Sequence, residues 1–352
     1  MNDFTEERPA SIAGASQEST NSHQRNSQQS AQQKARTLLA KLQKALSGVV
    51  QTHPETLQRV IITLLCRGHL LIEDVPGTGK TTLARALSQA LAVRMKRIQC
   101  TPDLMPSDIT GVSVYNSEDH KFHFIPGPVF SNILLADEIN RATPRTQSAL
   151  LEAMGEGTVT CDRKTYPLPD PFFVIATQNP VAFSGTFPLP EAQADRFMMR
   201  LSLGYPNAAQ EVAMMMAQLT GHPLEGVSPV LSEGHIKALQ KQMASVTLSK
   251  GMAQYIQAIV EATRNHPSIK LGSSPRGSLA LMHTARAAAF IQAQDHVTPD
   301  IVRSLLEPVL AHRMVFRDSA LNDEEQRRSF WKALLEGIPV PDQADTSPTP
   351  YF

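Results

Sequence analysis

Hydrophobic residues along the chain follow two patterns, one typical of amphipathic helices and one typical of buried strands. Apolar residues recur at helical spacing within residues 38–46, 57–64 and 83–91. Short continuous apolar runs at 70–72, 133–136 and 172–177 suit strands buried on both faces. Further strands are expected at 95–100 and in a segment ending at 203. Because such strands alternate with helices, the pattern predicts an α/β fold with a parallel sheet sandwiched by helices.

Two pairs of short segments interrupt this alternation. Residues 109–115 and 121–125 are expected to form one hairpin after a turn-rich stretch, and residues 158–162 and 164–168 a second. We interpret the first hairpin as an insertion that projects from the core.

The pattern changes again after residue 206, where no further strand is expected. Helix start signals follow instead: Asn207 with Gln210 resembles a capping box, and Ser249, Ser274 and Thr298 stand where N-caps are expected. We therefore predict an α/β domain over 32–206 and a small all-helical domain over 207–336.

Both ends of the chain have compositions that disfavour folding. Residues 1–31 are rich in Ser, Gln, Asn and Thr and contain little to bury, so we expect a disordered tail. Residues 337–352 are rich in Pro, Asp and Thr, and we expect them to be flexible.

Composition narrows the classes of function. The chain has 352 residues, of which 41% are hydrophobic, and its 33 Lys and Arg balance its 33 Asp and Glu. This balance provides no overall field that would attract nucleic acid. The three cysteines form no C-x-x-C pair, and no signal peptide or membrane-length apolar run is present, so we expect a cytoplasmic protein with structural thiols.

A glycine-containing stretch between the first strand and the next helix predicts a phosphate-binding loop. Its residues are Pro76, Gly77, Thr78, Gly79, Lys80, Thr81 and Thr82. Backbone N–H groups in such a loop converge on an anion, the lysine adds positive charge, and the hydroxyl of Thr81 can bind Mg²⁺. The strict motif begins with glycine, whereas this chain has Asp74 there. A glycine turn before a surface helix is the alternative, but the strand before and the helix after favour phosphate binding.

Carboxylate and amide side chains follow two of the other predicted strands. Asp137 can hold Mg²⁺, and Glu138 is placed to activate a water molecule as a general base. Asn179 ends the next strand, where its amide can contact the γ-phosphate of a nucleotide or orient the same water. A solvated acidic turn and an Asn-Pro turn are the alternatives.

Two arginines are candidates for contact with phosphate. Arg196 follows a short acidic helix. We expect it to lie too far from the nucleotide of its own chain to contact it, which suits an arginine finger that reaches the nucleotide of a neighbouring subunit. Arg276 lies in the first turn of a predicted helix, where the helix dipole disfavours a cation unless an anion is nearby. Surface salt bridges are the alternative for both residues.

Together these motifs resemble those of the MoxR family of AAA+ ATPases, which have the P-loop NTPase fold. The matching stretches are 73–81 as Walker A, 101–111, 124–142 ("FIPGPVFSNILLADEINRA") as Walker B, 146–154, 174–180 and 189–197 ("LPEAQADRF"). The resemblance implies that Lys80 and Thr81 are the Walker A pair and Asp137 and Glu138 the Walker B pair. It also implies that Asn179 is sensor 1, Arg196 the arginine finger and Arg276 sensor 2, and that both hairpins are family insertions.

The resemblance further implies a homo-oligomer, with ATP and Mg²⁺ bound between the subunits of a hexameric ring. Family members act as chaperone-like remodelling or maturation factors, usually on proteins with a von Willebrand factor A domain. A nucleic-acid motor and a nucleotide-gated scaffold are the alternatives, although the hairpins offer only Lys121, Arg163 and Lys164 to a phosphate backbone.

Overall fold

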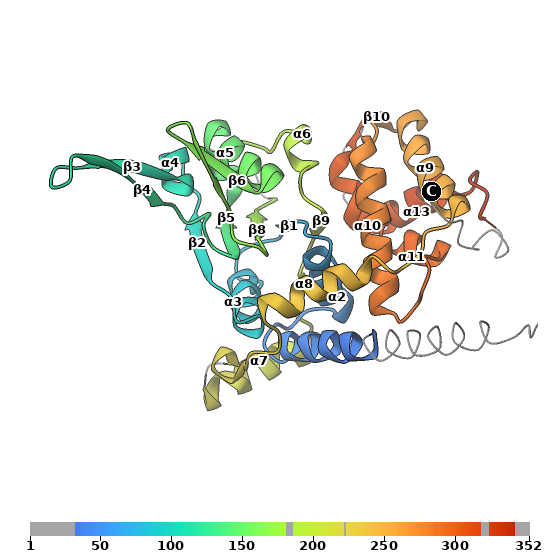
Figure 1. Cartoon of the computed structure of the whole chain (residues 1–352). Coiled ribbons are helices and arrows are strands. Elements are labelled where there is room, and N and C mark those ends of the chain that lie inside the picture. Colours follow the sequence, from blue (N-terminus) through green and yellow to red (C-terminus); the bar gives the residue numbers. More distant parts are fainter. Residues whose placement is uncertain (1–31, 181–185, 222, 318–323, 342–352) are drawn as a thin grey trace, which may run out of the picture.

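The computed structural model describes residues 32–180, 186–221, 223–317 and 324–341. The expected disordered tail at 1–31 lies outside the described residues, as do residues 342–352 of the expected flexible tail. An α/β part and a helical part lie side by side (Figure 1). Within the described residues, no helix is both long and apolar enough to cross a membrane.

A five-stranded parallel sheet forms the centre of the α/β part, as predicted. In spatial order its strands are β2 (Met95–Gln99), β5 (Ile133–Asp137), β8 (Phe173–Gln178), β1 (Leu70–Glu73) and β9 (Met199–Leu201). All four pairings between neighbouring strands are parallel. The carboxyl ends of the strands therefore lie along a single edge.

Helices cover both faces of this sheet. Leu70 and Ile72 of β1 join a hydrophobic cluster with the helix at 32–47, α2 (Pro54–Leu65) and α3 (Lys80–Ala90). Leu71 points to the opposite face and joins a second cluster with α5 (Pro144–Glu156). The strands β1, β5 and β8 are buried on both faces and therefore need apolar residues at consecutive positions, which explains their continuous apolar runs. The edge strand β2 is largely exposed and has no such run.

Both predicted hairpins form. The first joins β3 (Gly111–Asn116) to β4 (Lys121–Pro126) and extends away from the sheet, and the second joins β6 (Thr158–Cys161) to β7 (Lys164–Pro167) (Figure 1). The first hairpin starts later than predicted, because Ile109 belongs to a short helix, α4 (Pro106–Thr110). Gly111 makes the turn into β3 at φ +100°, where a Cβ would lie 2.4 Å from the Ile125 carbonyl oxygen.

The remaining described helices are α6 (Glu191–Ala194), α7 (Ala208–Thr220), α8 (Glu233–Met243), α9 (Lys250–Asn265), α10 (Pro275–Ile291), α11 (Pro299–Ser304), α12 (Leu306–Leu310) and α13 (Glu324–Leu335), with 3-10 turns η1 (Ile139–Arg141), η2 (Pro223–Gly226) and η3 (Ala311–Arg313). Side chains of Asn207, Ser249 and Ser274 cap α7, α9 and α10 as predicted, whereas that of Thr298 makes no cap bond.

One feature of the helical part differs from the prediction. Two strands, β10 (Ile269–Leu271) and β11 (Val315–Phe316), pair in antiparallel fashion, so the region after residue 206 is helical but not entirely so. Segments of three and two residues are too short to show a strand period. The pairing links α9 and η3, which are far apart in sequence.

The three cysteines are free thiols. Burial raises the pKa of the Cys66 thiol, and burial together with the nearby carboxylates of Asp137 and Glu138 raises that of Cys100 to about 12. Both thiols therefore stay protonated at neutral pH.

His69 precedes β1 and links the sheet to α5. Its Nδ1 accepts a hydrogen bond from the Val174 amide at 3.1 Å, and its Nε2 lies 3.1 Å from the Met154 carbonyl oxygen. Burial lowers the pKa of His69 from 6.5 to about 4, against a smaller opposing effect of the Met154 carbonyl. The imidazole is therefore neutral in the folded protein.

We expect this histidine to make the free energy of unfolding fall as the pH decreases. The unfolded chain binds the proton with a pKa of 6.5 and the folded chain only near 4, so the stabilisation present above about pH 6.5 is lost towards pH 4, by about 3 kcal/mol. Urea unfolding of His69→Gln across this range should show a shallower pH dependence than the wild type. Burial lowers the pKa of His312 in both proteins, so its share cancels in the comparison. Identical slopes would contradict the assignment.

Candidate functional site

The loop between β1 and α3 has a backbone that only glycine adopts without strain at two positions. Gly77 and Gly79 both have φ +89°, and a Cβ built at either would meet nothing within 4 Å. Backbone conformation rather than crowding is therefore what requires glycine. Gly79 is also the residue before α3, so the loop leads directly into a helix N-terminus.

Lys80 is held against this loop by its own backbone. Its Nζ donates to the carbonyl oxygens of Asp74 at 2.9 Å and Val75 at 2.7 Å. Burial lowers the pKa of the Lys80 ammonium, and the carboxylates of Asp74, Asp137 and Glu138 oppose that shift. The charge thus lies between the loop and the acidic residues that follow β5.

A pocket of about 360 Å³ lies at the carboxyl ends of the strands. Its lining comprises Asp74, Pro76, Gly77, Gly79, Lys80, Thr81, Thr82, Arg97, Gln99, Asp137, Glu138, Thr177, Gln178 and Asn179. The loop, both acidic residues and the asparagine named from the sequence therefore surround one space. Thr78 points away, and its hydroxyl lies 3.4 Å from the Val75 carbonyl oxygen.

The acidic pair after β5 is fixed by a threonine on the neighbouring strand. The Thr177 hydroxyl donates to Asp137 Oδ1 at 3.2 Å and accepts from the Glu138 amide at 2.9 Å. Arg97 Nε donates to the other Asp137 oxygen at 2.7 Å. Glu138 has left-handed backbone angles, φ 55° and ψ 52°, which turn the chain sharply at the end of the strand.

The Glu138 side chain is held by two more donors. Gln99 Nε2 and Arg141 Nη1 each lie 3.2 Å from Glu138 Oε2. The sequence had not indicated Arg97, Gln99 or Thr177 as site residues. Gln99 pairs in register with Asp137, but this neighbourhood follows from the order of the strands and not from any local motif.

Asp74, which departs from the strict loop motif, has a supporting contact network of its own. Its carboxylate accepts from the Ser202 hydroxyl at 2.7 Å and from the amides of Leu203 at 2.6 Å and Gly204 at 3.4 Å. The residue is 7% exposed. Asp74 therefore ties the start of the phosphate loop to the chain after β9, a contact that a glycine cannot make.

The two arginines named from the sequence do not line this pocket in the described part of the chain. Arg196 is half-buried against α5, where its guanidinium donates to the Leu151 carbonyl oxygen. Arg276 is exposed in the first turn of α10. Neither residue contributes to the pocket within its own chain as the structure has it.

A second cavity of about 250 Å³ lies beside the same loop. Its mostly apolar lining comprises Val49, Val50, Gln51, Gly77, Thr78, Gly79, Thr82, Pro206, Met214, Met215, Gln218 and Pro223. Gly77, Gly79 and Thr82 line both spaces, so the two cavities meet at the glycine loop. Its walls come from three segments that are distant along the chain, so no single local motif predicted the cavity.

The hydroxyl and carboxylate oxygens of the first pocket suit a hard divalent cation. The described residues contain no group of three or more His, Cys, Asp or Glu side chains that would hold a metal alone. Thr81 and Asp137 supply a hydroxyl and a carboxylate, a set that Mg²⁺ usually completes with phosphate oxygens and water. The residues present therefore fit a magnesium ion that arrives with a nucleotide.

Comparison with known proteins identifies the family. The family described as "ATPase family associated with various cellular activities (AAA)" matches residues 69–199, and the AAA lid domain matches residues 261–330. Chaperone MoxR1 of Mycobacterium tuberculosis is 36% identical over 83% of this chain and 80% of its own length. Protein MoxR of Paracoccus denitrificans is 33% identical over 84% of this chain and 94% of its own. This chain belongs to the MoxR family of AAA+ ATPases.

Other relatives of this MoxR-family chain carry less descriptive names. The uncharacterized protein YeaC of Bacillus subtilis is 48% identical over 80% of this chain and 88% of its own length. A crystal structure of a candidate ATPase from Cytophaga hutchinsonii superimposes with a TM-score of 0.82 at 34% identity, covering 91% of this chain and 99% of that one. The predicted AAA+ fold and helical lid are thereby confirmed.

The contacts of Asp74 lead to a prediction about stability. Asp74→Ala leaves the Ser202 hydroxyl and the Leu203 amide without their acceptor, while the Gly204 amide keeps the Ser202 Oγ at 3.1 Å. The free energy of unfolding should therefore fall by about 2 kcal/mol. Asp74→Asn keeps one oxygen acceptor and should lose less. Asp300→Ala, at a carboxylate whose side chain is 92% exposed, is the matched control and should change little. Urea unfolding measures all three, and an Asp74→Ala protein as stable as the control would contradict this role.

Proposed function

We propose that this MoxR-family ATPase binds ATP and Mg²⁺ at the pocket beside Lys80 and hydrolyses the γ-phosphate bond there. The observation that carries the proposal is the convergence of the glycine loop, Lys80, Asp137, Glu138 and Asn179 on one space. In this proposal the N–H groups of the loop and the Lys80 ammonium bind the phosphates. The adjoining apolar cavity, with Val50 and Met214 in its wall, suits the nucleotide base.

Thr81 and Asp137 are the residues that would hold Mg²⁺. When bound, the ion neutralises charge on the phosphate oxygens. Arg97 donates to Asp137 Oδ2 at 2.7 Å, and the carboxylate would keep lone pairs for the ion beside that contact. Thr177 supports the other oxygen and keeps the carboxylate in place.

Glu138 and Asn179 are proposed to act on the attacking water. The Glu138 carboxylate accepts a proton from that water, and the Asn179 amide orients it or contacts the γ-phosphate. The contacts from Gln99 and Arg141 hold the carboxylate in place. Release of one of these donors would free the Glu138 oxygen that takes the proton.

The two arginines are proposed to complete the site from different places. Arg196 would reach the ATP of a neighbouring subunit, and Arg276 would approach the ATP of its own chain from the lid. Neither arginine lines the pocket in the described part of the chain, so in this proposal Arg196 needs a partner chain and Arg276 a movement of the lid. A homo-oligomer, which the family resemblance suggests to be a hexameric ring, provides that partner.

The substrate of the remodelling reaction is proposed to be a protein, such as one with a von Willebrand factor A domain. One relative is named a chaperone. The projecting β3–β4 hairpin exposes apolar side chains, with Tyr115 at 51% and Phe122 at 72% exposure. Lys121 is the one Lys or Arg of this hairpin, which is a poor supply for a phosphate backbone.

Substitution of the proposed base tests the function directly. Glu138→Gln keeps the size of the side chain but cannot accept the proton, so kcat for ATP hydrolysis should fall about 100-fold while ATP binding persists. Lys80→Ala should lose binding as well. Phosphate release measures turnover, and equilibrium binding of a fluorescent ATP analogue measures affinity. Unchanged turnover in Glu138→Gln would remove this residue from its role.

Substitution of Arg196 tests whether sites are shared between subunits. If Arg196 acts in trans, the specific activity of the wild type should rise with protein concentration, and Arg196→Ala should lower kcat about 1000-fold at saturating protein. Arg67→Ala, at an arginine whose side chain is 60% exposed, is the control and should behave as wild type. Constant specific activity at every concentration, together with an active Arg196→Ala protein, would rule out a shared site.

A further inference from the structure

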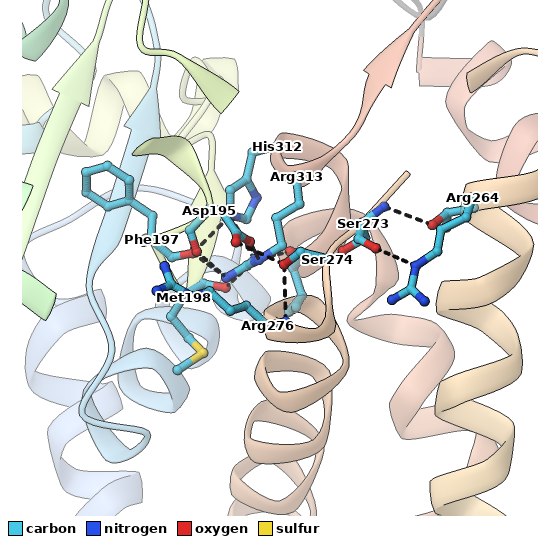
Figure 2. Close-up of polar contacts among 11 residues, drawn as sticks. Asp195, Phe197, Met198, Arg264, Ser273, Ser274, Arg276, His312 and Arg313 are labelled. Carbon is cyan, nitrogen blue, oxygen red and sulfur yellow. Dashed lines mark hydrogen bonds and ion pairs between the residues drawn. The ribbon is translucent and has the colours of Figure 1, made fainter. Parts of the chain in front are cut away.

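A buried arginine joins the helical part to the α/β part beside Arg196. The Arg313 side chain in η3 is 3% exposed, and its Nε donates to Asp195 Oδ1 at 2.9 Å. Its Nη2 donates to the carbonyl oxygens of Asp195 at 3.3 Å and Phe197 at 2.6 Å, and its Nη1 donates to those of Met198 and Val309. Figure 2 shows the guanidinium reaching across the joint to Asp195, Phe197 and Met198.

The joint depends on the carboxylate of Asp195. Burial lowers the pKa of Arg313 to about 10, while Asp195 opposes the shift, so the guanidinium is charged at neutral pH. A buried charge is tolerated only when it is paired and hydrogen-bonded. Asp195 is the carboxylate partner recorded for Arg313 among the described residues, and the remaining contacts are to main-chain oxygens and the His312 ring.

The other oxygen of Asp195 reaches the helix that carries Arg276. The Ser274 hydroxyl donates to Asp195 Oδ2 at 3.0 Å and accepts from the Arg276 amide at 3.1 Å as the N-cap of α10. The preceding residue is also fixed, because Arg264 Nε donates to the Ser273 carbonyl oxygen at 2.9 Å (Figure 2). A displacement at Ser274 therefore passes into the start of α10.

Asp195 is also the residue before Arg196. The Arg196 guanidinium rests over α5, and a Cβ added to Gly155 would lie 2.8 Å from its Nη1. The direction in which Arg196 leaves the chain is thus set between α5 on one side and the Asp195 contacts on the other. Asp195 thus connects both arginines. It is joined to Arg196 by the peptide bond, and its carboxylate is linked to the Arg276 amide through the Ser274 hydroxyl.

We propose that Asp195 is a positioning residue that holds Arg196 and Arg276 in one frame. The position of the lid is then transmitted to the arginine offered to the neighbouring subunit, whether or not the donor subunit holds a nucleotide. This inference rests on the roles proposed above for the two arginines. The competing possibility is that the cluster only stabilises the attachment of the lid.

The first experiment breaks the link to Arg276 and leaves the Arg313 pair intact. Ser274→Ala should lower kcat about tenfold with little change in KM for ATP, less than the loss of a whole charged donor. Ser249→Ala removes a matched serine cap, the one that accepts from the Met252 amide at 3.1 Å at the start of α9, and should keep wild-type kcat. Ser274→Thr retains the hydroxyl and should restore turnover.

The second experiment measures the effect on Arg196 alone by mixing subunits. Arg196→Ala subunits keep an intact lid and bind ATP, whereas Lys80→Ala subunits bind no ATP but can donate Arg196, so their mixture should recover activity. Donors that carry Lys80→Ala together with Asp195→Asn, or together with Ser274→Ala, should recover about tenfold less. A donor with Lys80→Ala and Ser249→Ala is the control. The Ser274→Ala donor keeps the test valid if Asp195→Asn does not fold.

The outcomes separate the two proposals. If the wild type hydrolyses ATP no faster than Lys80→Ala, the proposed function and this inference are both overturned. Normal turnover in the wild type, with Ser274→Ala equal to Ser249→Ala, would overturn the coupling alone. Equal recovery from all donors would show that the cluster serves the lid and not Arg196, which would also overturn the inference.

Discussion

The parallel pairing of β5, β8 and β1 is the constraint on which the site depends. Parallel strands present their carboxyl ends at one edge, and here β8 lies between the strand that leads to Lys80 and the strand that ends at Asp137. The glycine loop, the acidic pair and Asn179 come from three separate stretches of sequence, yet this order alone makes them neighbours. The strand order is in turn stabilised by burial of apolar side chains on both faces of the sheet, so the core determines the site.

Charged groups at this edge are held by a small number of polar contacts. The Thr177 hydroxyl donates its proton to Asp137 and accepts a hydrogen bond from the Glu138 amide, so one side chain holds both acidic residues. Asp74 satisfies three donors from the segment after β9. Each of these bonds crosses between strands, so a shift of any strand would leave a polar group in the interior without its partner.

The joint between the two parts of the chain combines apolar and ionic contacts. One hydrophobic cluster runs from the helices on the sheet into the helical part, where α10 and α8 contact α2. On the other side of the joint, the Arg313 guanidinium donates hydrogen bonds to main-chain carbonyl oxygens and to one carboxylate. Apolar contact permits small sliding movements, whereas a buried ion pair with directed hydrogen bonds does not. The ionic side therefore fixes the geometry around Asp195 more tightly than the apolar side fixes the rest of the lid.

The sequence by itself determined the elements whose cause is local. Apolar runs marked the buried strands, serine and asparagine caps marked helix starts, and the glycines of the loop followed from positive φ angles that need no tertiary partner. Tertiary structure alone decided the rest: the contacts of Gln99 and Thr177 with the acidic pair, the anchoring role of Asp74, the β10–β11 pair and the Asp195–Arg313 joint. Each of these joins residues that are distant along the chain. Their neighbourhood depends on strand order and on the docking of the lid, neither of which leaves a period or a motif in the sequence.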